Sequence, residues 1–80
     1  MPTVLRDAGY RFFFYSDEGD PLEPPHVHVT AGEGVAKFWL DPVALAGSRR
    51  LRAHELNELH ALVERHRAAF LESWYAHFDA

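Results

Sequence analysis

Apolar and polar residues follow a strand-like pattern in the first half of the chain and a helical pattern in the second half. Residues 10–15 are dense in aromatic side chains and predict a strand. Because side chains alternate along a strand, Tyr10, Phe12 and Phe14 are expected on one face. Arg11, Phe13 and Tyr15 are expected on the other. Aromatic residues on both faces indicate a strand that is covered on both sides.

A β-hairpin is predicted next. Residues 26–30 alternate strictly between histidine or threonine and valine, and residues 35–40 form the returning strand. Gly32 and Gly34 lie between them and supply a tight turn. The segment from Ser16 to Pro25 is predicted as a loop, since its prolines and glycine do not continue a strand.

The second half of the chain is predicted to be helical. Asp41-Pro42 has the form of a helix N-cap and first helical position, so residues 42–47 are expected to make one short helical turn that stops at Gly47. From residue 52 to residue 78 apolar side chains recur at three-, four- and seven-residue steps. The members of this stripe are Leu56, Leu59, Val63, Phe70 and Trp74.

These elements predict an α+β fold in one domain, residues 1–80. We expect a small antiparallel three-stranded sheet within residues 1–41, followed by a long or broken C-terminal helix packed on one face. Residues 4–6 are expected as a short extension of the first strand. A 27-residue helix spans about 40 Å and a six-residue strand about 20 Å. His66 and Arg67 also interrupt the apolar stripe, so a break is predicted at residues 64–67.

Length and composition narrow the class of protein. A core built from 80 residues is marginal, and the absence of cysteine excludes disulfides and thiolate metal sites.

The formal charge of −4 comes from the first 41 residues, so no general basic field attracts nucleic acid. The arginines at positions 49, 50 and 52 are interpreted as a solvated helix start. The N-terminus lacks a signal-peptide pattern and no apolar run is long enough to span a membrane, so a cytoplasmic protein is expected.

The six histidines are the main candidates for chemistry. His26 and His28 lie two apart on a predicted strand, so both side chains leave the same face. Two imidazoles can chelate a divalent ion such as zinc, but a site needs a third ligand. His66 or His77 would supply it only if the helix covered that face. The alternative is a pair of polar residues on a partly exposed strand, with no bound metal or other cofactor.

Metal-free RNA cleavage is a second chemical hypothesis for the same strand. Imidazole titrates near neutrality, as general acid–base catalysis requires, so His26 and His28 are candidate catalytic residues. Arg11 and Lys37, on neighbouring strands, are candidate phosphate ligands. RNA is therefore one candidate partner. His60 and Glu64 form a further i, i+4 pair, interpreted as an ordinary helix-surface contact.

The last helical segment is more aromatic than a three-stranded sheet easily covers. One interpretation is that it folds back into the core. The other is a protein-binding or dimer surface formed by Trp74, Tyr75 and Phe78, since Trp and Tyr are frequent interface anchors.

Four segments together resemble the bacterial domain-of-unknown-function family 4160. They are residues 1–3 (MPT), 9–16 (GYRFFFYS), 23–29 (EPPHVHV) and 36–43 (AKFWLDPV), and residues 71–74 (LESW) resemble the closing motif of that family. The resemblance spans essentially the whole chain. Family members commonly enter the helix through a serine capping box, whereas Arg52 stands at that position here.

The resemblance implies a small stand-alone protein without an established activity. Members are often encoded beside another small protein, an arrangement that resembles a toxin–antitoxin pair. The leading hypothesis is therefore a non-enzymatic interaction component of a two-gene module, binding a neighbour-encoded protein or itself. The alternative is the histidine-centred site.

Overall fold

The computed structural model describes residues 3–15 and 23–78, which form five strands and one helix. The predicted loop from Ser16 to Pro25 falls mostly outside this range, because residues 16–22 are not described. The elements are β1 (Thr3–Asp7), β2 (Tyr10–Phe13), β3 (His26–Ala31), β4 (Gly34–Leu40), β5 (Val43–Arg49) and α1 (Ala53–Phe78).

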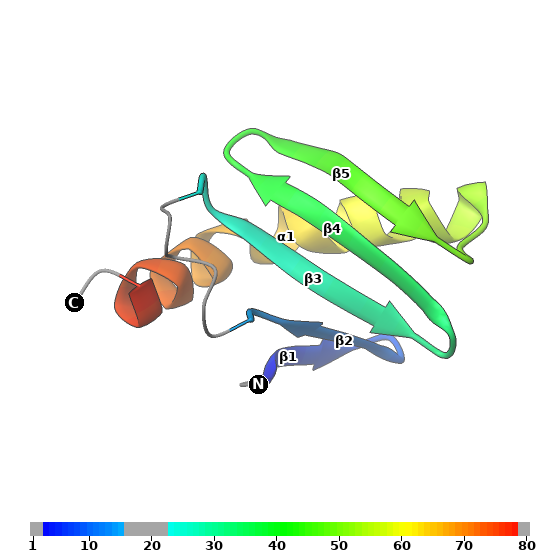
Figure 1. Ribbon diagram of the computed structural model, residues 1–80, viewed down its shortest axis with the longest axis horizontal. Helices are drawn as coiled ribbons and strands as arrows, with labels where there is room; N and C mark the ends of the chain where they lie inside the picture. Colours follow the sequence, from blue (N-terminus) through cyan, green and yellow to red (C-terminus); the bar gives the residue numbers. More distant parts are fainter. Residues whose placement is uncertain (1–2, 16–22, 79–80) are drawn as a thin grey trace.

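The strands form one antiparallel sheet in which each strand pairs with the next in the sequence, in the order β1-β2-β3-β4-β5. The helix lies across one face of this sheet (Figure 1). The α+β class and the C-terminal helix are therefore as predicted. The prediction of three strands is wrong, since the described residues form a sheet of five.

The first additional strand, β1, was expected only as an extension of β2. The chain instead reverses direction at Ala8 and Gly9, whose φ angles are 53° and 82°. Two-residue hairpin turns require this left-handed conformation, because it matches the twist of the flanking strands. The interruption in the strand pattern at these residues is thus a hairpin turn, and Asp7 pairs with Tyr10 across it.

The second additional strand, β5, replaces the short helical turn predicted for residues 42–47. Asp41 and Pro42 form the turn between β4 and β5, and Leu40 pairs with Val43 directly across it. Asp-Pro is compatible with a helix start and with a tight turn. Pairing with the long β4 strand decides between them, because β4 would otherwise leave one row of backbone groups unpaired.

The helix is continuous over 26 residues, so the predicted break at residues 64–67 is wrong. The two polar residues that interrupt the apolar stripe both have partners. His66 Nε2 lies 2.9 Å from Asp7 Oδ2 on β1. Arg67 donates from Nε to the Leu40 carbonyl and from Nη2 to Asp41 Oδ1, each at 2.7 Å. These contacts attach the middle of α1 to β1 and to the β4–β5 turn.

The start of the helix lacks a serine cap but keeps half of a capping box. The Arg52 backbone N–H donates to Glu55 Oε1 at 2.9 Å, which is the contact that the third helical residue makes in that motif. The helix accordingly begins at Ala53.

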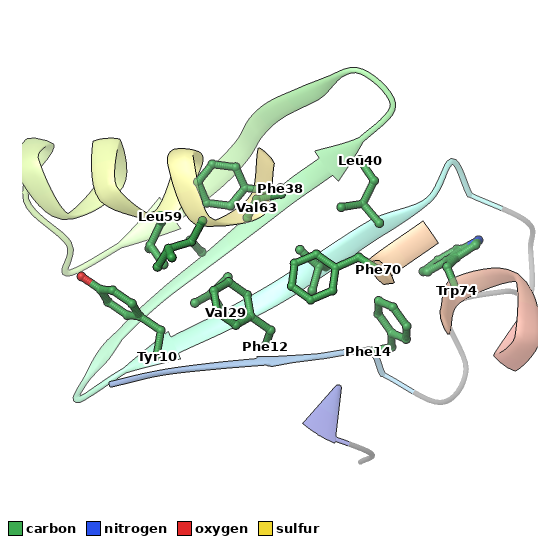
Figure 2. Close-up of a cluster of buried hydrophobic side chains, with 13 residues drawn as sticks. Tyr10, Phe12, Phe14, Val29, Phe38, Leu40, Leu59, Val63, Phe70 and Trp74 are labelled. Atoms are coloured by element: carbon green, nitrogen blue, oxygen red, sulfur yellow. The ribbon is translucent and has the colours of Figure 1, made fainter. Parts of the chain in front are cut away.

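The core lies between the sheet and α1 (Figure 2). As the alternation predicted, one face of β2 and of the residue that follows it, Phe14, enters the core. Phe12 and Phe14 are almost fully buried, and Phe12 packs on Phe70 of the helix with ring centroids 5.3 Å apart. The other core residues are Tyr10, Val27, Val29, Ala36, Phe38, Leu40, Leu59, Leu62, Val63 and Trp74. Most of the stability of so small a domain must come from this aromatic-rich layer.

Tyr10, at the rim of the core, is expected to make stability fall at alkaline pH. Burial raises the pKa of its phenol above the ordinary 10.0, and the hydrogen bond and negative charge of Glu58 raise it further. Above about pH 10 the unfolded chain loses this proton while the folded chain keeps it, so the free energy of unfolding decreases as pH rises toward the folded-state pKa. Urea denaturation across this range should show the decrease, and Tyr10→Phe should show less of it. Identical pH slopes for both proteins would contradict this assignment.

Candidate functional site

The candidate residues gather on the sheet face opposite α1, which we call the distal face. Val27 and Val29 point into the core under the helix, so the alternation of β3 places His26 and His28 on the distal face. The prediction that both imidazoles leave the same face is confirmed. Their ring centroids lie 5.2 Å apart, with the ring planes at 86°.

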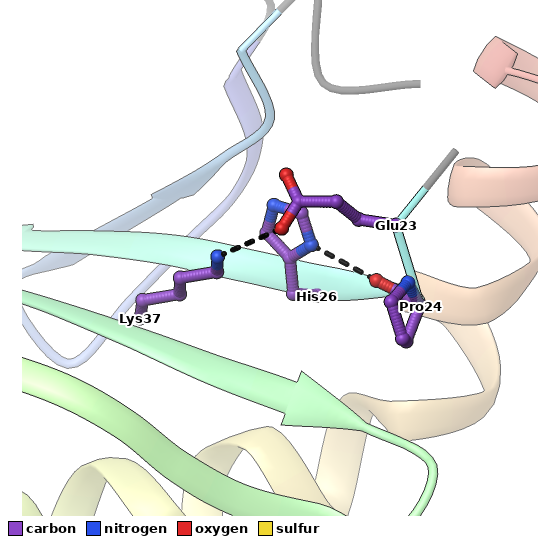
Figure 3. A network of polar contacts seen from close by, with 4 residues as sticks. All are labelled: Glu23, Pro24, His26 and Lys37. Atoms are coloured by element: carbon purple, nitrogen blue, oxygen red, sulfur yellow. Dashed lines mark hydrogen bonds and ion pairs between the residues drawn. The ribbon is translucent and has the colours of Figure 1, made fainter. Parts of the chain in front are cut away.

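His26 is enclosed. Its exposed fraction is 0%, and its ring lies 5.6 Å from that of Trp39 and 4.8 Å from that of Trp74. Its Nδ1–H donates to the carbonyl of Pro24 at 3.0 Å (Figure 3). A buried histidine with a backbone hydrogen bond and two tryptophans against it fixes the start of β3. Its environment is that of a structural residue.

His28 is half-buried and belongs to a group of rings. Its imidazole stacks on Phe13 with centroids 5.6 Å apart and planes at 27°, and it meets the edge of Tyr15 at 4.5 Å. Phe13 and His28 are directly paired across β2 and β3, which explains why the rings are neighbours. The distal face therefore carries an aromatic cluster made by Phe13, Tyr15 and His28.

The two predicted phosphate ligands also lie on this face. Lys37 is the cross-strand partner of His28; its Nζ lies 4.6 Å from the centroid of Trp39 and 3.4 Å from Glu23 Oε1 (Figure 3). The Arg11 guanidinium lies 4.6 Å over the ring of Phe13. Both cations are thus next to aromatic rings, where cation–π attraction holds them.

A groove of about 400 Å³ runs over the distal face from β2 to β5. One side is formed by the aromatic cluster and the other by residues of β4 and β5. Its lining residues are Phe13, Tyr15, His28, Val29, Val35, Ala36, Lys37, Gly47, Ser48 and Arg49. A smaller hollow of about 270 Å³ also touches Val35 and Arg49 and is completed by Glu33 and Arg50. The groove therefore has aromatic rings on one side and the cations Lys37 and Arg49 on the other.

Of the ten lining residues, only His28 and Lys37 were among the sequence-based candidates, and the aromatic and charged residues that were missed are Phe13, Tyr15 and Arg49. The alternation of the strand placed Phe13 and Tyr15 on the correct face. This alternation could have identified them as candidate site residues. Arg49 was interpreted as part of a solvated helix start, because β5 was not expected. The pairing of Val35 with Arg49 brings this arginine to the groove.

His66 does not join His26 and His28. The helix covers the opposite face, and His66 contacts Asp7 there. His77 is exposed near the end of the helix, with its ring on those of Phe14 and Phe78. Within residues 3–15 and 23–78 no three His, Asp or Glu side chains are grouped so that they could hold a metal ion. His60 Nε2 lies 3.5 Å from Glu64 Oε1 on the exposed helix surface, as expected for an ordinary i, i+4 contact.

The aromatic residues near the end of α1 divide between core and surface. Trp74 is 1% exposed and packs on Phe14 and Phe78, with ring centroids at 5.4 and 4.2 Å. Phe78 is half-buried against it. Tyr75 is 52% exposed, so of the three predicted interface residues it is the one that presents its ring to solvent.

The pattern of a family described as a domain of unknown function, DUF4160, matches residues 9–75. No curated protein and no solved structure matches the chain. In the part of the chain that the structure describes, the helix is not apolar enough to cross a membrane.

Proposed function

The chain belongs to the DUF4160 family, whose description states no activity, so we propose from the geometry of the site that the distal face binds single-stranded nucleic acid. The observation that carries this proposal is the groove, which has stacked rings on one side and the cations Lys37 and Arg49 on the other. Neither the rings nor the cations alone indicate a nucleic acid. A nucleotide uses both, because its base stacks on a ring and its phosphate contacts a cation.

The aromatic cluster offers a surface for bases. Tyr15 is 40% exposed and His28 is half-buried, whereas Phe13 is only 3% exposed and supports both of their rings. Unpaired bases stack on such rings in sheet-based nucleic-acid-binding domains, and each stacked base contributes about 1–3 kcal/mol. Bases inside a duplex do not offer their faces, so a single strand is the form that fits.

The cations offer a modest electrostatic contribution. Arg11, Lys37 and Arg49 lie on the distal face, whereas the net charge of the protein is −4. Three phosphate contacts predict that the logarithm of the binding constant falls with the logarithm of salt concentration with a slope of about −2. Binding should therefore depend more on stacking than on charge.

Binding is better supported than cleavage. Acid–base cleavage by two histidines needs both imidazoles at the scissile phosphate. His26 is fully buried and its Nδ1–H is used by Pro24, which leaves His28 as the histidine that lines the groove. One imidazole beside Lys37 is suited to contacting a phosphate or a base.

Fluorescence anisotropy with short labelled single-stranded RNA and DNA tests the proposal. Tyr15→Ala and Arg49→Ala should each weaken binding, Tyr15→Ala by about tenfold or more. Tyr75→Ala and Arg65→Ala are matched controls, because both side chains are exposed on α1, away from the groove. They should bind as the wild type does, and a duplex should bind more weakly than a single strand.

Comparison of the RNA and DNA arms identifies the natural ligand class. Absence of binding in both arms would overturn the proposal. So would equal losses in the groove variants and the helix-surface variants, because the interaction would then not involve the distal face.

A second proposal follows from the family likeness, namely a protein-interaction component of a two-gene, toxin–antitoxin-like module. The exposed ring of Tyr75 is the feature that supports it, since exposed tyrosines commonly anchor interfaces. Co-expression with the neighbour-encoded protein should recover a complex from the wild type and less of it from Tyr75→Ala. Failure to recover any complex would remove this proposal and leave the first unaffected.

A further inference from the structure

A row of side chains crosses the distal face at right angles to the strands, which lie side by side in the sheet (Figure 1). Directly paired residues of neighbouring strands share a face, and each member of the row is the direct partner of the next. Its members are Arg6 on β1, Arg11 on β2, Thr30 on β3, Val35 on β4 and Arg49 on β5. We call this set the arginine row, because it has cations at both ends and uncharged side chains between them.

Arg6 extends the arginine row to the edge strand β1. Its neighbours in the chain point to the helix side, because Leu5 packs against the core and Asp7 Oδ2 lies 2.9 Å from His66 Nε2. Alternation along β1 thus places the exposed Arg6 side chain on the distal face. The acid next to it in the chain, Asp7, is on the other face.

The pairing of Arg6 with Arg11 brings two like charges directly opposite each other. Such a pair lowers the stability of a sheet, whereas an opposite-charge pair raises it. The Arg11 guanidinium lies 4.6 Å over the ring of Phe13, which lines the groove, so this pair adjoins the proposed base-binding surface. A phosphate bound between the two arginines would offset their repulsion. An anion is therefore the ligand that suits this end of the row.

We infer that the arginine row is the track of the phosphate backbone and that a bound single strand crosses all five β-strands. This track rests on the proposed function, and it adds Arg6 as a phosphate ligand. Neighbouring strands are about 4.8 Å apart, so the row measures about 14 Å from Arg11 to Arg49 and about 19 Å from Arg6 to Arg49. A nucleic-acid strand as compact as in a duplex advances about 3.4 Å per nucleotide, so the row spans at most about six nucleotides.

A second row on the distal face gives the direction of the bases. Phe13, His28 and Lys37 are directly paired across β2, β3 and β4, and each lies two residues along its strand from the arginine row. Two residues of a strand measure about 7 Å. A backbone on the arginine row therefore directs its bases toward the second row, where His28 and the 40% exposed Tyr15 offer their rings.

A length series of single-stranded oligonucleotides tests the track. Fluorescence anisotropy should show that the affinity of the wild type rises up to about six nucleotides and then levels off. Arg6 adds a fourth phosphate contact, so the logarithm of the binding constant should fall with the logarithm of salt concentration with a slope of about −3, against about −2 without Arg6. Arg6→Gln should restore the slope of about −2 and weaken binding of an oligonucleotide of about eight nucleotides by about fivefold or more at about 50 mM salt.

Two further variants separate the charge of Arg6 from other effects. Arg6→Lys keeps the positive charge and should retain most of the affinity and the salt slope. Arg65→Gln makes the same change of charge on the exposed surface of α1 and should bind as the wild type does. Arg6→Gln removes one member of a like-charge pair, so thermal unfolding followed by circular dichroism should show a fold at least as stable as that of the wild type.

The results distinguish failure of the track from failure of the groove. If Tyr15→Ala weakens binding while Arg6→Gln leaves the affinity and the salt slope unchanged, the groove stands and the track is overturned. Equal losses for Arg6→Gln and Arg65→Gln would also overturn the track, since the effect would then be one of net charge. A wild type that binds no single strand of any length would overturn both.

Discussion

Replacement of Trp74 by alanine is expected to lower the free energy of unfolding by about 3–5 kcal/mol. The indole is 1% exposed and is the largest fully buried side chain of the described residues. It contacts Phe14 of the sheet and Phe78 of the helix, and it also closes the space over His26. Its removal leaves a cavity at the end of the core where few other side chains can move in.

Urea denaturation measures this loss, with the remaining Trp39 as the fluorescence probe. Tyr75→Ala provides the control, because it removes the adjacent ring, which is 52% exposed, and should change stability by less than about 0.5 kcal/mol. A loss of less than about 1 kcal/mol for Trp74→Ala would contradict the burial of the indole. It would instead favour the interpretation of Trp74 as an exposed interface residue.

Replacement of Gly34 by alanine should have the second largest effect, a loss of about 1–3 kcal/mol. Gly34 begins β4 and is buried beneath the segment that joins β5 to α1. A Cβ atom at this position would lie 2.8 Å from the backbone oxygen of Arg50 and would collide with the side chain of Leu51. Backbone atoms cannot rotate away, so the chain itself would have to shift.

Gly47→Ala is a closely matched control for this prediction. Gly47 is also a strand glycine without a positive φ angle, but a Cβ there would meet nothing within 4 Å. Its replacement should leave the denaturation midpoint almost unchanged or raise it slightly, since alanine restricts the unfolded chain. Equal losses for the two variants would show that close approach at Gly34 is not what limits substitution.

The sequence predicted those parts of the fold in which the periodicity is strong. Strict alternation in residues 26–30 located β3 and assigned its two faces, and the apolar stripe located α1. The missed strands lack such a signal: β1 has two apolar residues in succession, and β5 is rich in small residues that are as common in helices and turns. Their structure is determined by pairing with neighbouring strands, which a local pattern does not contain.

The residue types of the candidate site could be predicted from the sequence, but the burial of its side chains could not. Alternation placed His26 and His28 on one face, and Arg11 and Lys37 were expected on neighbouring strands. It did not reveal that His26 is sealed, because the sealing group is Trp74, 48 residues further along the chain. Such a contact depends on where the end of α1 lies over the sheet.

The interruption of the helix stripe shows the same limit in another form. His66 and Arg67 have the polarity expected of a helix break. In the structure, His66 contacts Asp7 of β1 and Arg67 contacts the β4–β5 turn. A polar residue in an apolar stripe therefore indicates either a break or a specific anchor, and only the tertiary structure distinguishes them.

The order of the elements has a consequence for synthesis on the ribosome. Each hairpin of the meander can close as soon as its second strand has emerged, because every strand pairs with its immediate predecessor. The aromatic underside of that sheet, however, has no cover until α1 has followed, and Phe70 and Trp74 come late in α1. The nascent chain thus passes through a stage with paired strands and an exposed apolar surface, and during that stage it should depend most on chaperones.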